Sequence, residues 1–266
     1  MIIDTHAHVN FEAFESDWQE VIADCQQHEI WMINVGAQLA TSRRAVDIAQ
    51  QYERGVYAAI GLHPIHVSGS EFHPEAFNVD DYRALVLSSK KIVAIGETGI
   101  DFFHSDSNFE NQKKVFTKQI RLAKEFDLPI IIHGRNSKDG TKDAYQEILN
   151  IVKTEKYNRG VVHCYGGNLS QALEFSELGF YVGFTGIVTF DKTGKLPEIA
   201  SKISLSSMLI ETDSPYLAPE PHRGKRNQPQ YVRQVAEKIA EIKSVSYTTV
   251  VEEMTKNSFN LFKFNS

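Results

Sequence analysis

The stretch Met1–Asn10, MIIDTHAHVN, decides how the rest of the chain is interpreted. Its apolar residues Ile2 and Ile3 are typical of the start of a buried strand, and the polar residues after them mark the end of that strand. Side chains two residues apart in an extended chain point the same way, so His6 and His8 are expected to project together. Two converging imidazoles are a natural pair of metal ligands, although two solvated histidines would give the same pattern.

Composition narrows the class of protein. The chain has 266 residues, 42% hydrophobic and 23% charged, which is ordinary for a globular protein. An α/β barrel takes ~250 residues in one domain, so we expect a single domain over residues 1–266. No apolar stretch reaches the ~20 residues of a membrane helix, and the N-terminus lacks the apolar segment of a signal peptide. Two cysteines imply no disulfide framework, which favours a reducing cytoplasm. We also expect no membrane association and no obligate protein partner.

The formal net charge of −6 argues against broad electrostatic attraction to nucleic acid. It does not exclude a nucleic-acid enzyme, because bound divalent metals and a local basic loop can supply positive charge where it is needed.

Eight apolar runs alternate with helical patterns along the chain. The expected strands are Met1–Thr5, Ile30–Val35, Val56–Ile60, Lys91–Ile95, Pro129–Ile132, Gly160–Val162, Phe180–Gly183 and Ser207–Ile210. The expected helices are Ser16–Gln27, Ser42–Glu53, Asp80–Ser88, Asn108–Phe126, Asp143–Lys153, Ser170–Leu178, Pro197–Ile203, Gln230–Ile242 and Thr248–Phe262. This alternation predicts an α/β fold, a (β/α)8 TIM barrel. A doubly wound open sheet is the competing interpretation, but the glycine fingerprint of a dinucleotide fold is absent after the first run.

Metal-ligating residue types gather at the ends of these expected strands, where a barrel places its catalytic residues. The set consists of His6, His8, Glu97, His133, His163 and Asp213. Imidazole together with carboxylate suits zinc, manganese or magnesium. Glu97 could bridge two ions through its two oxygens, and Asp213 could orient or deprotonate a water. We therefore expect a shared metal site at the mouth of the barrel; the alternative is a set of separately satisfied polar strand ends.

An ordered series of motifs extends this pattern over essentially the whole chain. They are Ile3–His8 (IDTHAH), Gly61–Pro64 (GLHP), Ile95–Asp101 (IGETGID), Ile131–Arg135 (IIHGR), Val162–Tyr165 (VHCY), Phe184–Phe190 (FTGIVTF), Glu211–Pro219 (ETDSPYLAP) and Arg223–Asn227 (RGKRN). In these motifs the chain resembles the TatD-type metal-dependent deoxyribonucleases of the amidohydrolase-like TIM-barrel superfamily. It departs from the family pattern at Thr98, at Asn136-Ser137 and at Tyr165-Gly166, which concern substrate preference rather than the candidate ligands.

The resemblance implies two divalent metal ions, Mg²⁺ or Mn²⁺ in catalysis with Zn²⁺ as an alternative. One ion would be held by His6, His8, Glu97 and Asp213, and the other by Glu97, His133 and His163. Glu97 and Asp213 would then be the catalytic carboxylates. The implied reaction is hydrolysis of DNA phosphodiester bonds by metal-activated water, in an exonuclease acting on single-stranded ends.

Other residues are candidates for substrate contact. They are His63, Arg135, Arg223, Lys225 and Arg226. Each has a structural alternative: a loop-stabilising imidazole for His63, an ion pair for Arg135 and a solvated basic turn for the rest. Asp101 is expected either to hydrogen-bond a ligand histidine or to cap a turn. Cys164 is expected to point away from His163, because neighbouring residues of a strand face opposite sides.

Two rival functions remain open at this stage. The same barrel and metals could cleave an amide, or an ester such as an aminoacyl-RNA. Alternatively, the chain could be a non-enzymatic binding subunit whose metals are structural, which the full ligand set argues against.

Overall fold

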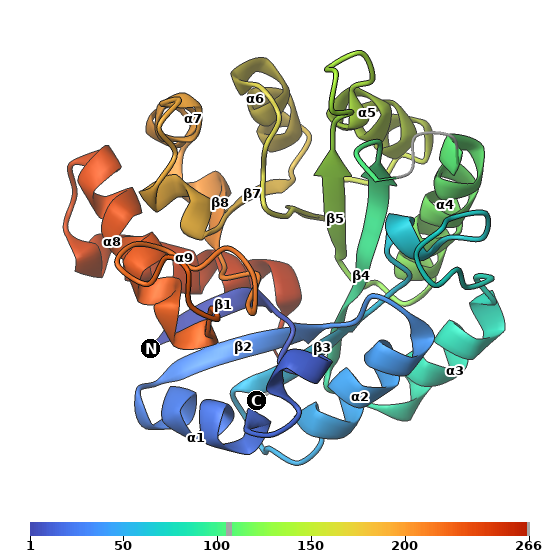
Figure 1. The fold of residues 1–266 in the computed structure, drawn as a ribbon, viewed down its shortest axis with the longest axis horizontal. Coiled ribbons are helices and arrows are strands. Elements are labelled where there is room, and N and C mark those ends of the chain that lie inside the picture. Colours follow the sequence, from blue (N-terminus) through green and yellow to red (C-terminus); the bar gives the residue numbers. More distant parts are fainter. Residues whose placement is uncertain (105–107, 265–266) are drawn as a thin grey trace.

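The computed structural model describes residues 1–104 and 108–264 and shows a parallel barrel inside a ring of helices (Figure 1). The strands pair in the order of the sequence, from β1 to β8. Their bounds are β1 (Ile2–Ala7), β2 (Ile30–Val35), β3 (Val56–Ile60), β4 (Ile92–Asp101), β5 (Ile130–Arg135), β6 (Gly160–Val162), β7 (Tyr181–Phe184) and β8 (Met208–Ile210). The predicted TIM barrel is confirmed.

The helices follow the strands around the outside of the barrel. They are α1 (Trp18–Gln27), α2 (Leu39–Ala49), α3 (Val79–Ser88), α4 (Phe109–Glu125), α5 (Ala144–Thr154), α6 (Leu169–Glu177), α7 (Lys195–Lys202), α8 (Val232–Lys243) and α9 (Tyr247–Phe262). No helix in the described part of the chain combines the length and the apolar character needed to cross a bilayer.

Each strand buries both of its faces. One set of alternate residues, such as Ile30 and Met32 of β2, packs against the surrounding helices in a large apolar core. The other set, such as Ile33 on the same strand, forms a second cluster with Phe262 and Phe264 near the end of the chain. A strand buried on both sides reads as a continuous apolar run, which explains why the strands were visible in the sequence.

The second cluster also fixes where the polar residues lie. Ile131, Val161 and Leu209 belong to it, and the residues two positions further along the chain are His133, His163 and Glu211. Because positions two apart on a strand share a face, the apolar layer of the barrel interior is followed by a polar layer at its mouth.

The barrel closes between β1 and the end of β8. An isolated parallel bridge joins Ala7 to Ser214, and the backbone N–H of Asp213 donates to the carbonyl of His6 at 2.8 Å. The buried carboxylate of Asp4 accepts bonds from the backbone N–H of Thr212 at 2.9 Å and from its hydroxyl at 2.5 Å. Burial raises the pKa of Asp4 well above its usual range. This closure, which we call the β1–β8 seam, brings His6 and His8 next to Asp213.

Candidate metal centre

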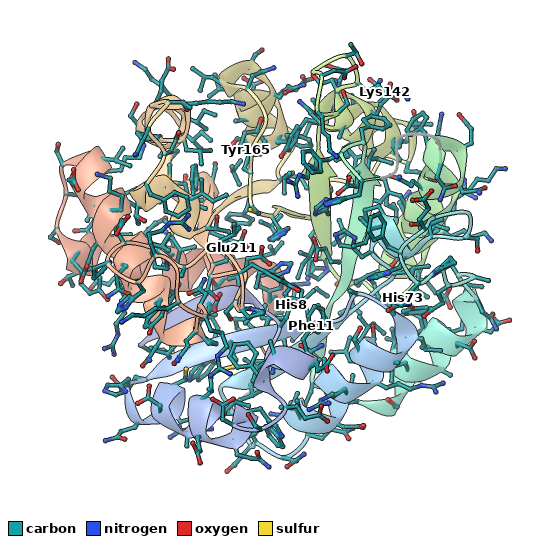
Figure 2. All side chains as sticks on the ribbon, viewed as in Figure 1. His8, Phe11, His73, Lys142, Tyr165 and Glu211 are labelled. Carbon is teal, nitrogen blue, oxygen red and sulfur yellow. The ribbon has the colours of Figure 1, made fainter. Side chains whose placement is uncertain are left out.

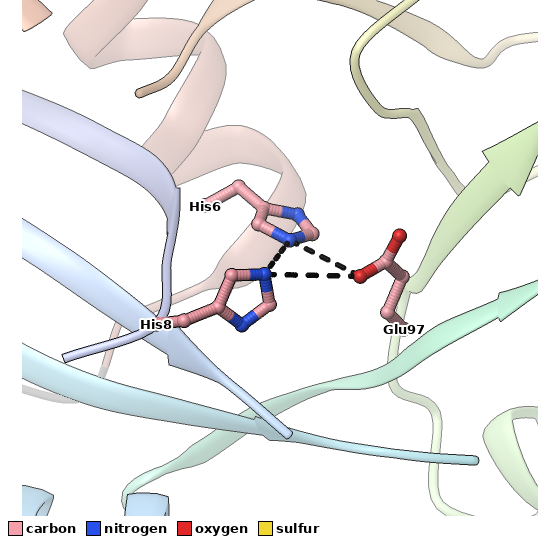
Figure 3. A group of neighbouring side chains, drawn as sticks. All are labelled: His6, His8 and Glu97. Atoms are coloured by element: carbon pink, nitrogen blue, oxygen red, sulfur yellow. Dashed lines mark hydrogen bonds and ion pairs between the residues drawn. The ribbon is translucent and has the colours of Figure 1, made fainter. Parts of the chain in front are cut away.

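His6 of β1 and His8, one residue beyond its end, point their Nε2 atoms at each other and at Glu97 of β4 (Figure 3). The two Nε2 atoms lie 3.1 Å apart, and Nε2 of His6 lies 3.4 Å from Oε2 of Glu97. The Nδ1 atom of His8 lies 2.8 Å from the carbonyl oxygen of Val35, which can only accept. His8 therefore carries its hydrogen on Nδ1 and turns the lone pair of Nε2 toward Glu97.

Asp213 completes this half of the centre from the segment after β8. Its Oδ1 atom lies 3.3 Å from Nε2 of His8 and 3.8 Å from Nε2 of His6. Burial alone would raise the pKa of Asp213, but the neighbouring histidines His8, His163 and His6 lower it. The side chain is therefore an ionised carboxylate at neutral pH.

The second half of the centre surrounds the other oxygen of Glu97. Oε1 lies 2.9 Å from Nδ1 of His133 and 3.2 Å from Nε2 of His163. Each oxygen of this one carboxylate thus faces a different pair of histidines. Burial would raise the pKa of Glu97, but the surrounding histidines His63, His163 and His133 lower it well below its usual range.

These distances fit bound cations. Ligand atoms around a tetrahedral ion with bonds of 2.0–2.1 Å lie about 3.3 Å apart. The donor pairs around the two oxygens of Glu97 have separations of 2.9 to 3.4 Å. Glu97 and the histidines are buried, except for His133, which is partly exposed. Groups of ligand atoms close enough to share an ion include His6, His8 and Glu97. The structure therefore brings together the six side chains that the sequence singled out.

Two further carboxylates, those of Asp101 and Glu211, contact the two histidines of the second half. Oδ2 of Asp101 lies 3.0 Å from Nε2 of His133, as one of the two sequence-based alternatives for Asp101 expected. Burial alone would lower the pKa of His133, but the hydrogen bonds to Asp101 and Glu97 raise it to about 9. With Nε2 held by Asp101, Nδ1 is the nitrogen of His133 that is free to bind a cation beside Glu97.

The sequence analysis missed Glu211, which has the same relation to His163. Its Oε1 atom lies 3.0 Å from Nδ1 of His163 and accepts the backbone N–H of Cys164 at 2.5 Å. Burial alone would lower the pKa of His163, but Glu211 and Glu97 raise it well above its ordinary value. A signal was available, because Glu211 lies two residues beyond Leu209 and therefore on the inner face of its strand. Figure 2 shows Glu211 and His8 near the centre of the barrel.

His63 faces the same oxygen of Glu97 from the loop after β3. Its Nε2 atom lies 3.2 Å from Oε1 of Glu97, and its Nδ1 atom accepts the backbone N–H of Ile65 at 3.1 Å. Burial lowers the pKa of His63 to about 4, so the ring is neutral. A neutral imidazole that accepts at Nδ1 carries its hydrogen on Nε2, so His63 presents a donor and no lone pair to the centre.

Cys164 corrects one expectation. The thiol was expected to face away from His163, but the structure gathers His163, Cys164 and Asp213 within 4.8 Å of one another. Strand β6 ends at Val162, and Cys164 has a φ of 44°, so the alternation rule does not apply to it. Burial raises the pKa of Cys164 to about 12, which keeps the thiol protonated.

The centre forms the floor of a pocket of about 660 Å³. Its walls include Ile65, His104, Arg135, Ile187 and Tyr216, contributed by several of the loops that follow the strands. Of the candidate substrate contacts, His63 and Arg135 line this pocket. Such a space admits a substrate with several polar groups rather than a single small ion.

The basic loop after β8 is divided between two roles. Arg223 is exposed, with its guanidinium carbon 3.6 Å from the centre of the Phe190 ring, and Lys225 is also exposed. Arg226, in contrast, donates to Asp17 at 2.9 Å and to the carbonyl of Ala13 at 2.7 Å. Its guanidinium is engaged in this ion pair, and a substrate contact of Arg226 stays a prediction.

Known proteins resemble the chain over its whole length. A family model described as TatD related DNase matches residues 3–263. The uncharacterized metal-dependent hydrolase YabD of Bacillus subtilis strain 168 is 38% identical over 268 residues, covering 100% of both chains. The uncharacterized metal-dependent hydrolase YcfH of Escherichia coli strain K12 is 32% identical over 271 residues, covering 100% of this chain and 97% of its own. The crystal structure of YJJV, a TatD homologue from Escherichia coli K12, superposes with a TM-score of 0.88 at 28% identity, covering 99% and 98% of the two chains.

Proposed function

Because the chain belongs to the TatD related DNase family, we propose that this metal-dependent hydrolase cleaves phosphodiester bonds of DNA, as an exonuclease acting on single-stranded ends. The observation that carries the proposal is the position of Glu97, with one oxygen toward His6 and His8 and the other toward His133 and His163. A carboxylate between two sets of donors is the arrangement that two-metal phosphodiesterases need.

We assign the first cation to His6, His8, Glu97 and Asp213, and the second to Glu97, His133 and His163. Two bound divalent cations supply Lewis acidity toward a phosphate and make water acidic enough to react at neutral pH. Mg²⁺ or Mn²⁺ fits the carboxylate ligands, and Zn²⁺ fits the histidines.

The chain's own groups would handle the proton and the phosphate. Asp213 is ionised and borders the pocket, so the oxygen of its carboxylate that does not face His6 and His8 can orient the attacking water and accept its proton. The Nε2–H of His63 can donate a hydrogen bond to a phosphate oxygen that enters beside Glu97. Arg135, Arg223 and Lys225 stand outside the centre as cations for the neighbouring phosphates.

The test uses a labelled single-stranded oligonucleotide, the same strand in a blunt duplex and a circular single strand, each with Mg²⁺ or Mn²⁺. We expect progressive shortening of the linear single strand, slower attack on the duplex, no cleavage of the circle, and complete loss with a chelator. Glu97→Ala and His133→Ala should each lower the rate at least 100-fold, about 2.7 kcal/mol or more. Arg121→Ala, which removes an exposed ion pair with Glu155, serves as the control.

Two results would overturn the proposal. One is a linear single strand that stays intact with either metal while acyl-ester or amide substrates are hydrolysed. The other is undiminished DNA cleavage after Glu97→Ala and His133→Ala.

A further inference from the structure

Aromatic rings and cations lie together beside the pocket, on the segments after β3, β4 and β5, and two of them, His104 and Arg135, line the pocket itself. The guanidinium carbon of Arg135 lies 3.8 Å, and Nζ of Lys138 lies 4.7 Å, from the centre of the Phe103 ring. The ring of His104 meets Phe103 edge-on with centroids 4.9 Å apart, and Phe72 meets His104 in the same way at 5.6 Å. We call Phe72, Phe103, His104, Arg135 and Lys138 the β4–β5 rim.

The cations of this rim are available to a ligand. Arg135 and Lys138 are both exposed, and in residues 1–104 and 108–264 neither forms an ion pair with a carboxylate. The acidic neighbour Asp139 is engaged in its own turn, where its Oδ1 accepts the Ser137 hydroxyl at 2.7 Å and the Thr141 backbone N–H at 3.0 Å. Two positive charges therefore stand together on a protein whose net charge is −6, so they favour an anionic group at this place.

The rim is continuous with the metal centre. Asp101, which contacts His133, also accepts the backbone N–H of His104 at 2.8 Å. In the backbone register of β4 and β5, Asp101 lies opposite Arg135. Arg135 itself lies two residues beyond His133 on β5, and both line the same pocket. A chain molecule with one phosphate beside Glu97 would therefore cover the rim with its next unit.

The turn that carries Lys138 is also ordered before any ligand arrives. The backbone N–H of Ser137 donates to the carbonyl of Lys142 at 3.1 Å, and the N–H of Lys142 donates to the hydroxyl of Ser137 at 2.9 Å. Binding at the rim would cost little ordering of the backbone, because the turn is already closed.

A single-stranded nucleic acid matches this chemistry, because it offers a flat base and a phosphate at every unit. Bases stack on aromatic rings and on guanidinium planes, while a duplex hides both faces of each base. We propose that the β4–β5 rim binds the nucleotide next to the scissile phosphate, with its base against the rings and its phosphate near Arg135 and Lys138. This inference rests on the proposed function and names the part of the site that prefers single strands.

The test compares two single-stranded oligonucleotides that differ only in having abasic residues at both ends. Phe103→Leu should raise the KM for the intact oligonucleotide by roughly 5- to 150-fold, the range that loss of one base–aromatic stack gives. For the abasic oligonucleotide the KM should change less than about twofold, since there is no base to stack. Arg135→Ala should raise the KM for both, because it also removes a phosphate contact. Arg121→Ala on the outer face of α4 is the matched loss of an exposed arginine.

The rim is refuted if Phe103→Leu affects the two oligonucleotides equally, or affects neither. It is also refuted if Tyr216→Ala, on the wall of the pocket near His8, causes the base-dependent loss instead. Binding of the same oligonucleotides in the presence of a chelator, followed by fluorescence anisotropy, separates this inference from the proposed function. Suppose that wild-type protein binds the intact strand more tightly than the abasic strand, but cleaves neither when Mg²⁺ or Mn²⁺ is present. That result would contradict the proposed nuclease activity and leave the proposed binding at the rim standing.

Discussion

The buried carboxylate of Glu211 behind His163 gives a sharp test of the metal centre. Glu211 is fully buried, and its Oε1 atom accepts bonds from Nδ1 of His163 and from the backbone N–H of Cys164. Glu211→Gln keeps the size of the side chain and an acceptor oxygen, but it removes the negative charge. That charge favours the hydrogen on Nδ1 of His163 and so keeps the lone pair of Nε2 directed at Glu97.

The expected magnitude follows from this arrangement. Loss of such an outer partner typically weakens metal binding 10- to 100-fold, which is about 1.4–2.7 kcal/mol. The pH dependence has a definite sign. Glu211 raises the pKa of His163 in the metal-free protein, so wild-type His163 must release a proton before it can bind a cation. The variant should release fewer protons when it binds a cation. Its loss of metal affinity relative to wild type should therefore be smaller at pH 6.5 than at pH 8.

The assay is calorimetric titration of chelator-treated protein with Mn²⁺ at both pH values. Glu155→Gln provides the control, because Glu155 pairs with Arg121 away from the pocket. Melting curves verify that each variant is folded. The reasoning is refuted if folded Glu211→Gln binds Mn²⁺ within twofold of wild type at pH 8, or if its deficit shrinks as the pH rises.

Three other outcomes are expected. In metal-free protein the folded-state pKa of His133, about 9, exceeds the unfolded value of ~6.5. The protonated ring therefore stabilises the fold fully below pH 6.5, and this stabilisation is lost as the pH rises through 9. Urea unfolding in the presence of a chelator should show a free energy of unfolding that falls over this pH range, and a flat or rising one contradicts the assignment. Arg226→Ala should lower the free energy of unfolding by about 1 kcal/mol, through loss of the ion pair with Asp17, and leave the KM for DNA within twofold. A large rise in the KM would instead indicate that Arg226 contacts the substrate. Gly183→Ala places a Cβ 2.7 Å from Oε1 of Glu211 and should weaken metal binding in the same titration, whereas unchanged affinity would mean that the carboxylate moves freely.

The sequence predicted the barrel because each strand is buried on both faces and stands out as an apolar run. It predicted the ends of the long strands less well. Strand β4 was expected to stop at Ile95 but continues to Asp101, with Gly99 paired to His133 and Asp101 to Arg135. Polar residues normally end a buried strand, but here neighbouring elements supply their partners, including Gln112 of α4 for the backbone of Asp101.

The candidate ligands were predictable because spacing along a strand determines which face a side chain occupies. The partners of charged side chains were not, since they depend on segments that are distant in sequence. Nothing local distinguishes Arg226, which meets Asp17, from Arg223, which lies over Phe190. The left-handed backbone at Cys164 was equally invisible, because no glycine marks it.

The β1–β8 seam has a consequence for how the protein selects its ion. Asp4 and Thr212, which join there, are 208 positions apart, and His6 faces Asp213 only once they have met. An unfolded or partly synthesised chain offers scattered imidazoles, which rank divalent ions by intrinsic affinity and favour copper and zinc. The closed barrel offers instead a fixed spacing of nitrogen and oxygen donors, so coordination geometry takes part in the choice. We therefore expect the choice of ion to follow folding and to depend both on this donor geometry and on the cations that the compartment supplies.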